Sequence, residues 1–388
     1  MFEKPVYVKD LESNVTFLSQ DIKSLYSRIQ QARHQKEVIP WEVRNQVLAL
    51  VGEDGARPYS FRREATAGAE AMHTTLCDIK LEAKAAAEDE YHETGWNHSV
   101  HTPLLKLVYM SRKQSRGTPQ LGKLASARVV SAMSATIWGN YIPIKPSKLP
   151  TLSKLLLHPV SDAGSGSLAS GVLACSVSND ASSGTGTDYG STATEKHRHM
   201  HSRSDSKRVD YVLVMDAQDD APLQRVFSHF VYNEALERDL LPHVNQTLYR
   251  PLQWSPIACS IKTKVETAAQ DPMLQLGTWV AAWHKRMHIL RQYLFSKAPS
   301  LWRPGRQEDR LPSTLLIEVV NHEWRLYFTC DRGASIDLYG PLSIGSTRHL
   351  TEAYALVASL EAIKEWIETT FREGMDRWLM CNELLDMT

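Results

Sequence analysis

The sequence has few cysteines, no long apolar run and no excess of either charge, and each absence excludes a class of protein. The 388 residues include five cysteines without a Cys-x-x-Cys pair, which argues against a disulfide framework and a zinc ribbon. No stretch approaches the ~18 apolar residues of a membrane span, so no membrane partner is expected. Lys plus Arg and Asp plus Glu both number 44, which argues against a histone-like binder of polyanions.

The first residues contain acids and no continuous apolar stretch, so they do not resemble a secretory signal. Together with the scattered cysteines, this predicts a reducing environment for the chain. We therefore expect an intracellular protein of the cytoplasm or nucleus that is not secreted.

The spacing of apolar residues predicts an α/β fold built on one central mixed sheet. Among the inward candidates of one predicted helix are Leu274, Trp279 and Ala282. Two of the predicted strands form a pair joined at Asn321-His322. Helices are expected over residues 10–35, 65–110, 272–295 and 354–371, and strands over 128–137, 209–216, 255–265 and 313–330.

One segment, residues 161–207, is rich in Ser, Gly, Thr and Asp. Such a composition buries too little apolar surface to offset the entropy of ordering the chain, so it predicts a disordered insertion. The insertion divides the core. The expected parts are an N-terminal helical region packed on the core (1–90), a first core part (91–160), the insertion (161–207) and a second core part (208–388).

Ionisable residues lie within two strands that are otherwise apolar. Asp210 stands at the head of one predicted strand, and Lys262 and Lys264 at the tail of the next. A charged side chain in a buried strand is costly unless it is paired or functional. Two interpretations follow: a buried ion pair of Asp210 with one of the lysines, or an active site.

Several separated blocks of the chain share one pattern of order and spacing. The blocks are Glu93, Trp96-Asn97, Val100-His101, Leu104-Leu105, Arg208-Val209-Asp210-Tyr211, Asn245-Gln246-Thr247, Pro256-Ile257, Ile261-Lys262-Thr263-Lys264, Leu274-Gln275-Leu276-Gly277-Thr278-Trp279, Leu311-Pro312, Trp324, Ile344-Gly345-Ser346-Thr347, Tyr354 and Trp366. Together they resemble one known family, the fungal PD-(D/E)XK nuclease-like proteins. The resemblance implies a restriction-endonuclease-like core, with a central mixed sheet flanked by helices, here with an N-terminal helical extension and the insertion.

The resemblance also implies a catalytic site that binds Mg²⁺ or Mn²⁺, which carboxylates suit. Asp210 matches the first metal-binding carboxylate and Lys264 the lysine that positions the attacking water. Glu93 is a candidate acid from a helix, and Gln275 with Trp279 resembles the Q-x-x-x-Y helix of recombination nucleases. The expected second carboxylate is replaced by Lys262.

This replacement weakens the predicted metal site. At an effective dielectric of ~20, a unit charge 4 Å away is worth about 4 kcal/mol per unit of charge product. A change from carboxylate to ammonium is a change of two units beside a dication, so magnesium affinity should fall sharply. Glu93, Glu266 or another acid would have to enter the metal shell to compensate.

The neutral total charge hides a basic middle of the chain. Residues 101–208 hold 14 basic and five acidic residues, a net charge of +9 that leaves −9 on the remainder. Arg112, Lys113 and Arg116 are the candidates there for contact with a nucleic-acid backbone. Alternatively, these basic residues pair with acidic helices over 82–93 and 352–376.

Three functions remain open from the sequence. The first is a nuclease-like hydrolase that cleaves nucleic acid with an altered metal shell. The second is a non-catalytic module that binds nucleic acid or protein. The third is a diverged enzyme that acts on a small molecule in secondary-metabolite biosynthesis, where the closely spaced Lys262 and Lys264 would depress each other's pKa and supply a base.

Overall fold

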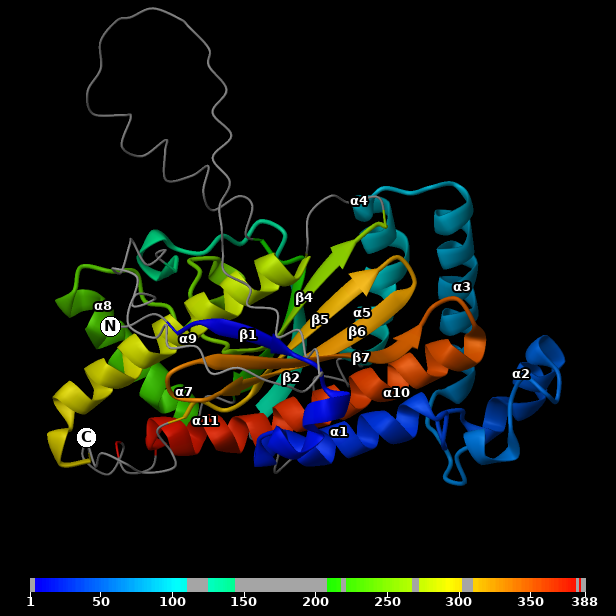
Figure 1. Cartoon of the computed structure of the whole chain (residues 1–388), viewed down its shortest axis with the longest axis horizontal. Helices are drawn as coiled ribbons and strands as arrows, with labels where there is room; N and C mark the ends of the chain where they lie inside the picture. Colours follow the sequence, from blue (N-terminus) through cyan, green and yellow to red (C-terminus); the bar gives the residue numbers. More distant parts are fainter. Residues whose placement is uncertain are drawn as a thin grey trace, which may run out of the picture.

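A seven-stranded mixed sheet forms the centre of the molecule (Figure 1). The computed structural model describes residues 4–109, 125–143, 208–217, 221–266, 272–301, 310–381 and 384. Neighbours in the order β1-β7-β6-β5-β4-β3-β2 are hydrogen-bonded; β1/β7 and β4/β5 are parallel and the other pairs antiparallel. The strands are β1 (Val6–Lys9), β2 (Ala125–Ser131), β3 (Tyr211–Ala217), β4 (Ile257–Lys264), β5 (Thr314–Val320), β6 (Glu323–Asp331) and β7 (Ile336–Ser346).

Helices flank this sheet (Figure 1). The long helix α9 joins the parallel strands β4 and β5 as a crossover and packs against both, whereas α1 and α10 pack against β7 and each other. The helices are α1 (Gln20–Arg33), α2 (Arg44–Val51), α3 (Ala69–Glu88), α4 (Glu93–Trp96), α5 (Thr102–Tyr109), α7 (Pro222–Val226), α8 (Tyr232–Glu237), α9 (Pro272–Lys297), α10 (Leu350–Trp366) and α11 (Arg372–Leu379). No helix in the described ranges is long and apolar enough to cross a membrane.

The structure confirms the predicted fold class, a mixed sheet between helices. It also confirms the strand pair over 313–330, which turns at Asn321 with a left-handed φ of 51°. The sequence did not predict β1 or β7. The predicted helix over 10–35 is interrupted, because Ser19 is extended and α1 begins only after it. Leu274 was wrongly placed inward, since it is 40% exposed, while Trp279 and Ala282 are buried.

The core depends on a close approach between β7 and α10. Gly345 in β7 has a φ of +137°, and a Cβ added there would lie 2.6 Å from the Cβ of Leu356 in α10. Only glycine allows the strand and the helix to meet at this distance. The contact fixes one side of the sheet, and the charged residues that the sequence singled out lie nearer the other side, on β4 and at the start of β3.

Candidate functional site

Four charged side chains meet at the end of β4. The Nζ atom of Lys262 lies 2.9 Å from Oδ2 of Asp210 and 3.0 Å from Oε1 of Glu93. The Nζ atom of Lys264 lies 3.3 Å from the other oxygen of Glu93, Oε2. Two ammonium groups therefore neutralise two carboxylates, and Lys262 is bound to both acids.

The pairing of β3 with β4 brings Asp210 and Lys262 together. Tyr211 is opposite Ile261 in this antiparallel pair, and the Asp210 amide donates to the Ile261 carbonyl at 2.9 Å. The next residues outward, Asp210 and Lys262, are therefore cross-strand neighbours. Oδ2 of Asp210 also accepts from the backbone N–H and the hydroxyl of Thr263, at 2.7 and 3.0 Å. Burial raises the pKa of Asp210, and the charge of Lys262 opposes that rise.

Glu93 reaches the two lysines because its helix is fastened to the sheet. α4 continues through a π-helical turn, η4 (Asn97–His101), into α5. The Tyr211 hydroxyl at the start of β3 lies 3.1 Å from the Asn97 carbonyl, and the ring of Trp96 stacks edge-on against His322 with centroids 4.9 Å apart. Both contacts hold the start of the helix over the end of the sheet, so Glu93 projects onto β4.

A buried histidine completes this attachment. Burial lowers the pKa of His101 to about 4, so its ring is neutral at pH 7. Its Nε2 lies 3.0 Å from the carbonyl of Asn321 in the turn between β5 and β6, which the ring can reach as a donor. The helix that carries Glu93 is thus joined to β3 on one side and to this turn on the other.

The residues present do not fit a divalent metal between Asp210 and Glu93. The ammonium of Lys262 contacts both carboxylates, so a metal ion would have to displace a side chain that is only 7% exposed. Glu266, named above as a substitute ligand, is exposed beyond the end of β4. Another acid, Glu318, is in register with Lys262 on β5 and is bound by the Tyr327 hydroxyl at 3.2 Å. Among the described residues, neither acid forms an ion pair with Lys262 or Lys264, and Glu318 instead lies 3.7 Å from Nη1 of Arg325.

Of the other candidate residues, Gln275 is described by the structure, whereas the basic candidates are not. Gln275 is buried on α9, the helix that packs against β4. Arg112, Lys113, Arg116 and most of the basic region lie outside the described residues, as does the 161–207 insertion. Within the described part of that region, Arg128 pairs with Asp216 (Nη2 to Oδ1, 3.1 Å), not with either acidic helix.

Sequence reasoning missed two members of the site's surroundings, Thr263 and Glu318. Thr263 was read only as part of a motif, although its amide and hydroxyl hold Asp210 in place. The alternation of side chains along β5 would have placed Glu318 beside Lys262, but only once the parallel register of β4 and β5 was known.

Comparison with known proteins gives one match. A family model described as the PD-(D/E)XK nuclease superfamily matches residues 47–372, which is most of the chain and includes all four residues of the charged cluster. No curated protein matches the sequence. No solved structure matches it either.

Proposed function

The chain belongs to the PD-(D/E)XK nuclease superfamily, and from this premise we propose that it binds nucleic acid without metal-dependent cleavage. The proposal rests on two features, a nuclease-like fold and a cluster in which the ammonium of Lys262 lies where a metal ion would bind between Asp210 and Glu93. It makes the protein a binding module and not a hydrolase.

The observation that carries the proposal is the position of Lys262. Its ammonium lies within 3.1 Å of Asp210 and of Glu93, the two acids that the family resemblance assigns to the metal. A buried ammonium that is already hydrogen-bonded is costly to move, since the charge would lose its partners. Asp210 and Glu93 are therefore not free to bind the metal ion that phosphodiester hydrolysis would require at this position.

The nucleic-acid partner is supported by charge. The net +9 of residues 101–208 is interrupted by few acids, and such a segment attracts the phosphate backbone by releasing its counterions. Arg112, Lys113 and Arg116 are the residues that we assign to backbone contact. Lys106 and Arg208 are basic residues of the same region that the structure describes.

A small-molecule substrate has less support. The cavity beside β4, lined by Cys259, Trp279 and Trp283 among others, has a volume of about 10 Å³. That is room for about one water molecule. We therefore do not assign this cavity to a metabolite.

Binding is tested by fluorescence anisotropy with single- and double-stranded DNA and RNA, at about 50 and about 200 mM salt. We expect binding that weakens with salt, no cleavage with Mg²⁺ or Mn²⁺, and unchanged binding in Asp210→Asn. Neutralising Arg112, Lys113 and Arg116 to alanine should lower the salt slope on duplex DNA by about 2.7, at about 0.9 per phosphate contact.

The matched control removes three exposed basic residues elsewhere, Lys23, Arg33 and Lys36. This variant loses the same charge but should bind like the wild type. Absence of binding at low salt would refute the proposal. Cleavage that requires Mg²⁺ and is lost in Asp210→Asn would replace it with the nuclease hypothesis.

A further inference from the structure

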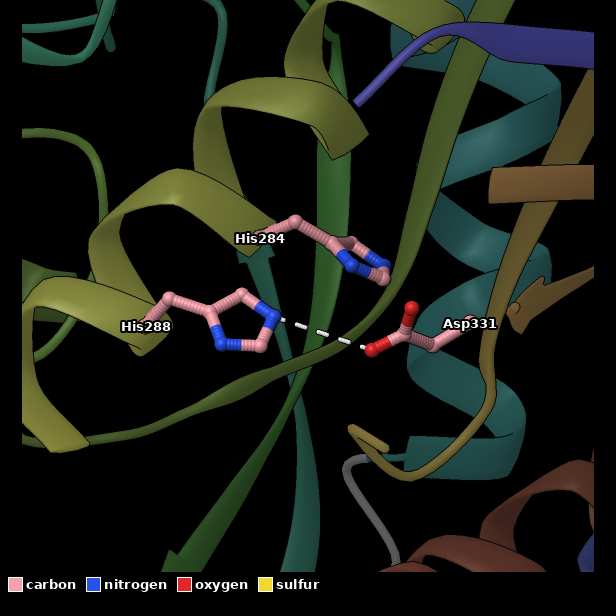
Figure 2. A group of neighbouring side chains, drawn as sticks. All are labelled: His284, His288 and Asp331. Carbon is pink, nitrogen blue, oxygen red and sulfur yellow. Dashed lines mark ion pairs between the residues drawn. The ribbon is translucent and has the colours of Figure 1, made fainter. Parts of the chain in front are cut away.

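A second cluster of ionisable side chains lies where α9 passes the end of β6, and the nuclease-like site does not use it. It consists of His284, His288 and Asp331, and Figure 2 shows both imidazole rings directed toward the carboxylate. The two histidines are four residues apart on α9, which places them on one face of the helix. One donor atom from each of the three residues lies within 4.8 Å of the others.

Asp331 is held rigidly in this cluster. Its Oδ2 accepts from the Leu311 amide at 3.0 Å, and its Oδ1 from the Gly333 amide at 2.9 Å. These contacts fix the carboxylate without using all of its acceptor capacity, because each oxygen has two lone pairs.

The histidines differ in how they are held. His284 is 2% exposed, and its Nδ1 has no hydrogen-bond partner among the described residues. A buried ring nitrogen without a partner is uncommon and requires an explanation. His288 is more accessible, with 21% of its side chain exposed, and its ring packs edge-on against Trp378.

A lysine already contacts two members of the cluster. The Nζ atom of Lys4 lies 2.6 Å from Oδ1 of Asp331 and 2.9 Å from Nε2 of His288. A positive charge thus already sits between two of the three donors. Lys4 comes just before β1, which is the edge strand of the sheet, and its side chain is 15% exposed.

We propose that His284, His288 and Asp331 form a binding site for a transition metal of the zinc class, which Lys4 closes when the metal is absent. Two imidazole nitrogens and one carboxylate oxygen suit Zn²⁺ or Co²⁺ better than Mg²⁺, which prefers oxygen donors. The metal replaces the ammonium of Lys4, and water or another donor takes the fourth position.

The geometry requires a modest contraction. Donors bound to Zn²⁺ at ~2.0–2.1 Å in a tetrahedron are ~3.3 Å apart, so atoms now within 4.8 Å must approach by at most about 1.5 Å. Nε2 of the partly exposed His288 already lies 3.7 Å from Oδ2 of Asp331, so this pair needs to approach by only about 0.4 Å. The larger part of the contraction brings these two residues and His284 together.

The test uses the full chain and compares zinc affinity, by competition with a chromophoric chelator, between the wild type and Lys4→Met. We expect Lys4→Met to bind one Zn²⁺ at least tenfold more tightly than the wild type, because no ammonium competes for the donors. Co²⁺ bound to this variant should show the visible d–d absorption of a tetrahedral site. Adding His288→Ala to Lys4→Met should abolish both signals.

The matched control is Lys9→Met, which removes an ammonium from β1, the edge strand that follows Lys4; Lys9 pairs with Asp337 at 2.8 Å. This variant should bind zinc like the wild type. Equal zinc affinity in Lys4→Met and the wild type would refute the claim that Lys4 competes with zinc. Zinc affinity that survives His288→Ala would refute the claim that these three residues form the site. Should Lys4→Met fail to fold, Lys4→Gln replaces it, since a neutral amide can still donate to Asp331.

Discussion

Lys262→Glu is the most informative single substitution, because it restores the carboxylate that the superfamily pattern expects. In the wild type, Asp210 and Glu93 share the ammonium of Lys262, and Lys264 balances the second negative charge. The substitution leaves three carboxylates facing one ammonium. We expect a cluster that is strained without a metal and that binds Mn²⁺.

The size of the effect follows from the contacts. The Lys262 ammonium lies 2.9 Å from Asp210 and 3.0 Å from Glu93, and at an effective dielectric of ~20 each such pair is on the order of 5 kcal/mol before desolvation is subtracted. The contact with Glu93 is weaker than this, since 30% of that side chain is exposed to solvent. Breaking a buried pair typically costs about 3–5 kcal/mol of unfolding free energy, which we expect for Lys262→Glu without metal.

Metal binding should return part of this loss. A ligand at 100 times its dissociation constant stabilises the folded state by about 2.7 kcal/mol. Thermal unfolding with and without Mn²⁺ measures this recovery, and calorimetric titration measures the affinity. The wild type should show neither a shift in Tm nor heat of binding from this site.

Lys262→Met is the control, because it removes the ammonium and keeps an unbranched side chain without adding a ligand. It should be destabilised and should bind Mn²⁺ more weakly than Lys262→Glu. Equal Mn²⁺ affinity in the two variants, or wild-type affinity as high as that of Lys262→Glu, would show that Lys262 does not control metal binding.

Two further predictions concern stability. Burial lowers the pKa of both His101 and His243 to about 4, against about 6.5 when unfolded. The unfolded chain therefore binds more protons between these pH values, so the free energy of unfolding decreases as the pH is lowered. Urea unfolding should show a loss of about 2 kcal/mol per histidine from pH 7 to pH 5, and a flatter profile in His101→Gln; equal profiles would contradict this. Gly345→Ala should cost at least about 2 kcal/mol through its clash with Leu356, whereas Gly333→Ala, with a similarly positive φ but open space, should cost about 1 kcal/mol in chemical denaturation.

The fold was predictable where local signals were strong. The β5/β6 pair was recognised because two apolar runs flank Asn321, a residue that tolerates the left-handed turn. β7 escaped recognition because Gly340-Pro341 lies inside it and reads as a break. β1 has four residues, and its pairing with β7, more than 300 residues away in sequence, is what makes it a strand.

The candidate site was predictable only where its residues belong to strands that are close in the predicted order. Asp210 and Lys262 belong to strands that follow each other in the predicted order, so their meeting was foreseeable from the residues. Glu93 is 169 residues from Lys262, and only the family resemblance connected them. The second cluster has a readable signal, two histidines four residues apart, but Lys4 and Asp331 are 327 residues apart and meet only in the folded sheet.

In both clusters a lysine ammonium contacts side chains of types that bind metals, two carboxylates at Lys262 and a carboxylate with an imidazole at Lys4. The position of each lysine in the sheet decides how easily its ammonium can move. Lys262 is in β4, between β3 and β5, with 7% of its side chain exposed, so its ammonium would have to give up its ion pairs with Asp210 and Glu93 to make room for a metal. Lys4 flanks the edge strand β1, and its more accessible side chain can swing into solvent. We therefore expect Lys262 to exclude a metal from its cluster, and Lys4 to compete with a metal for the donors of the second cluster.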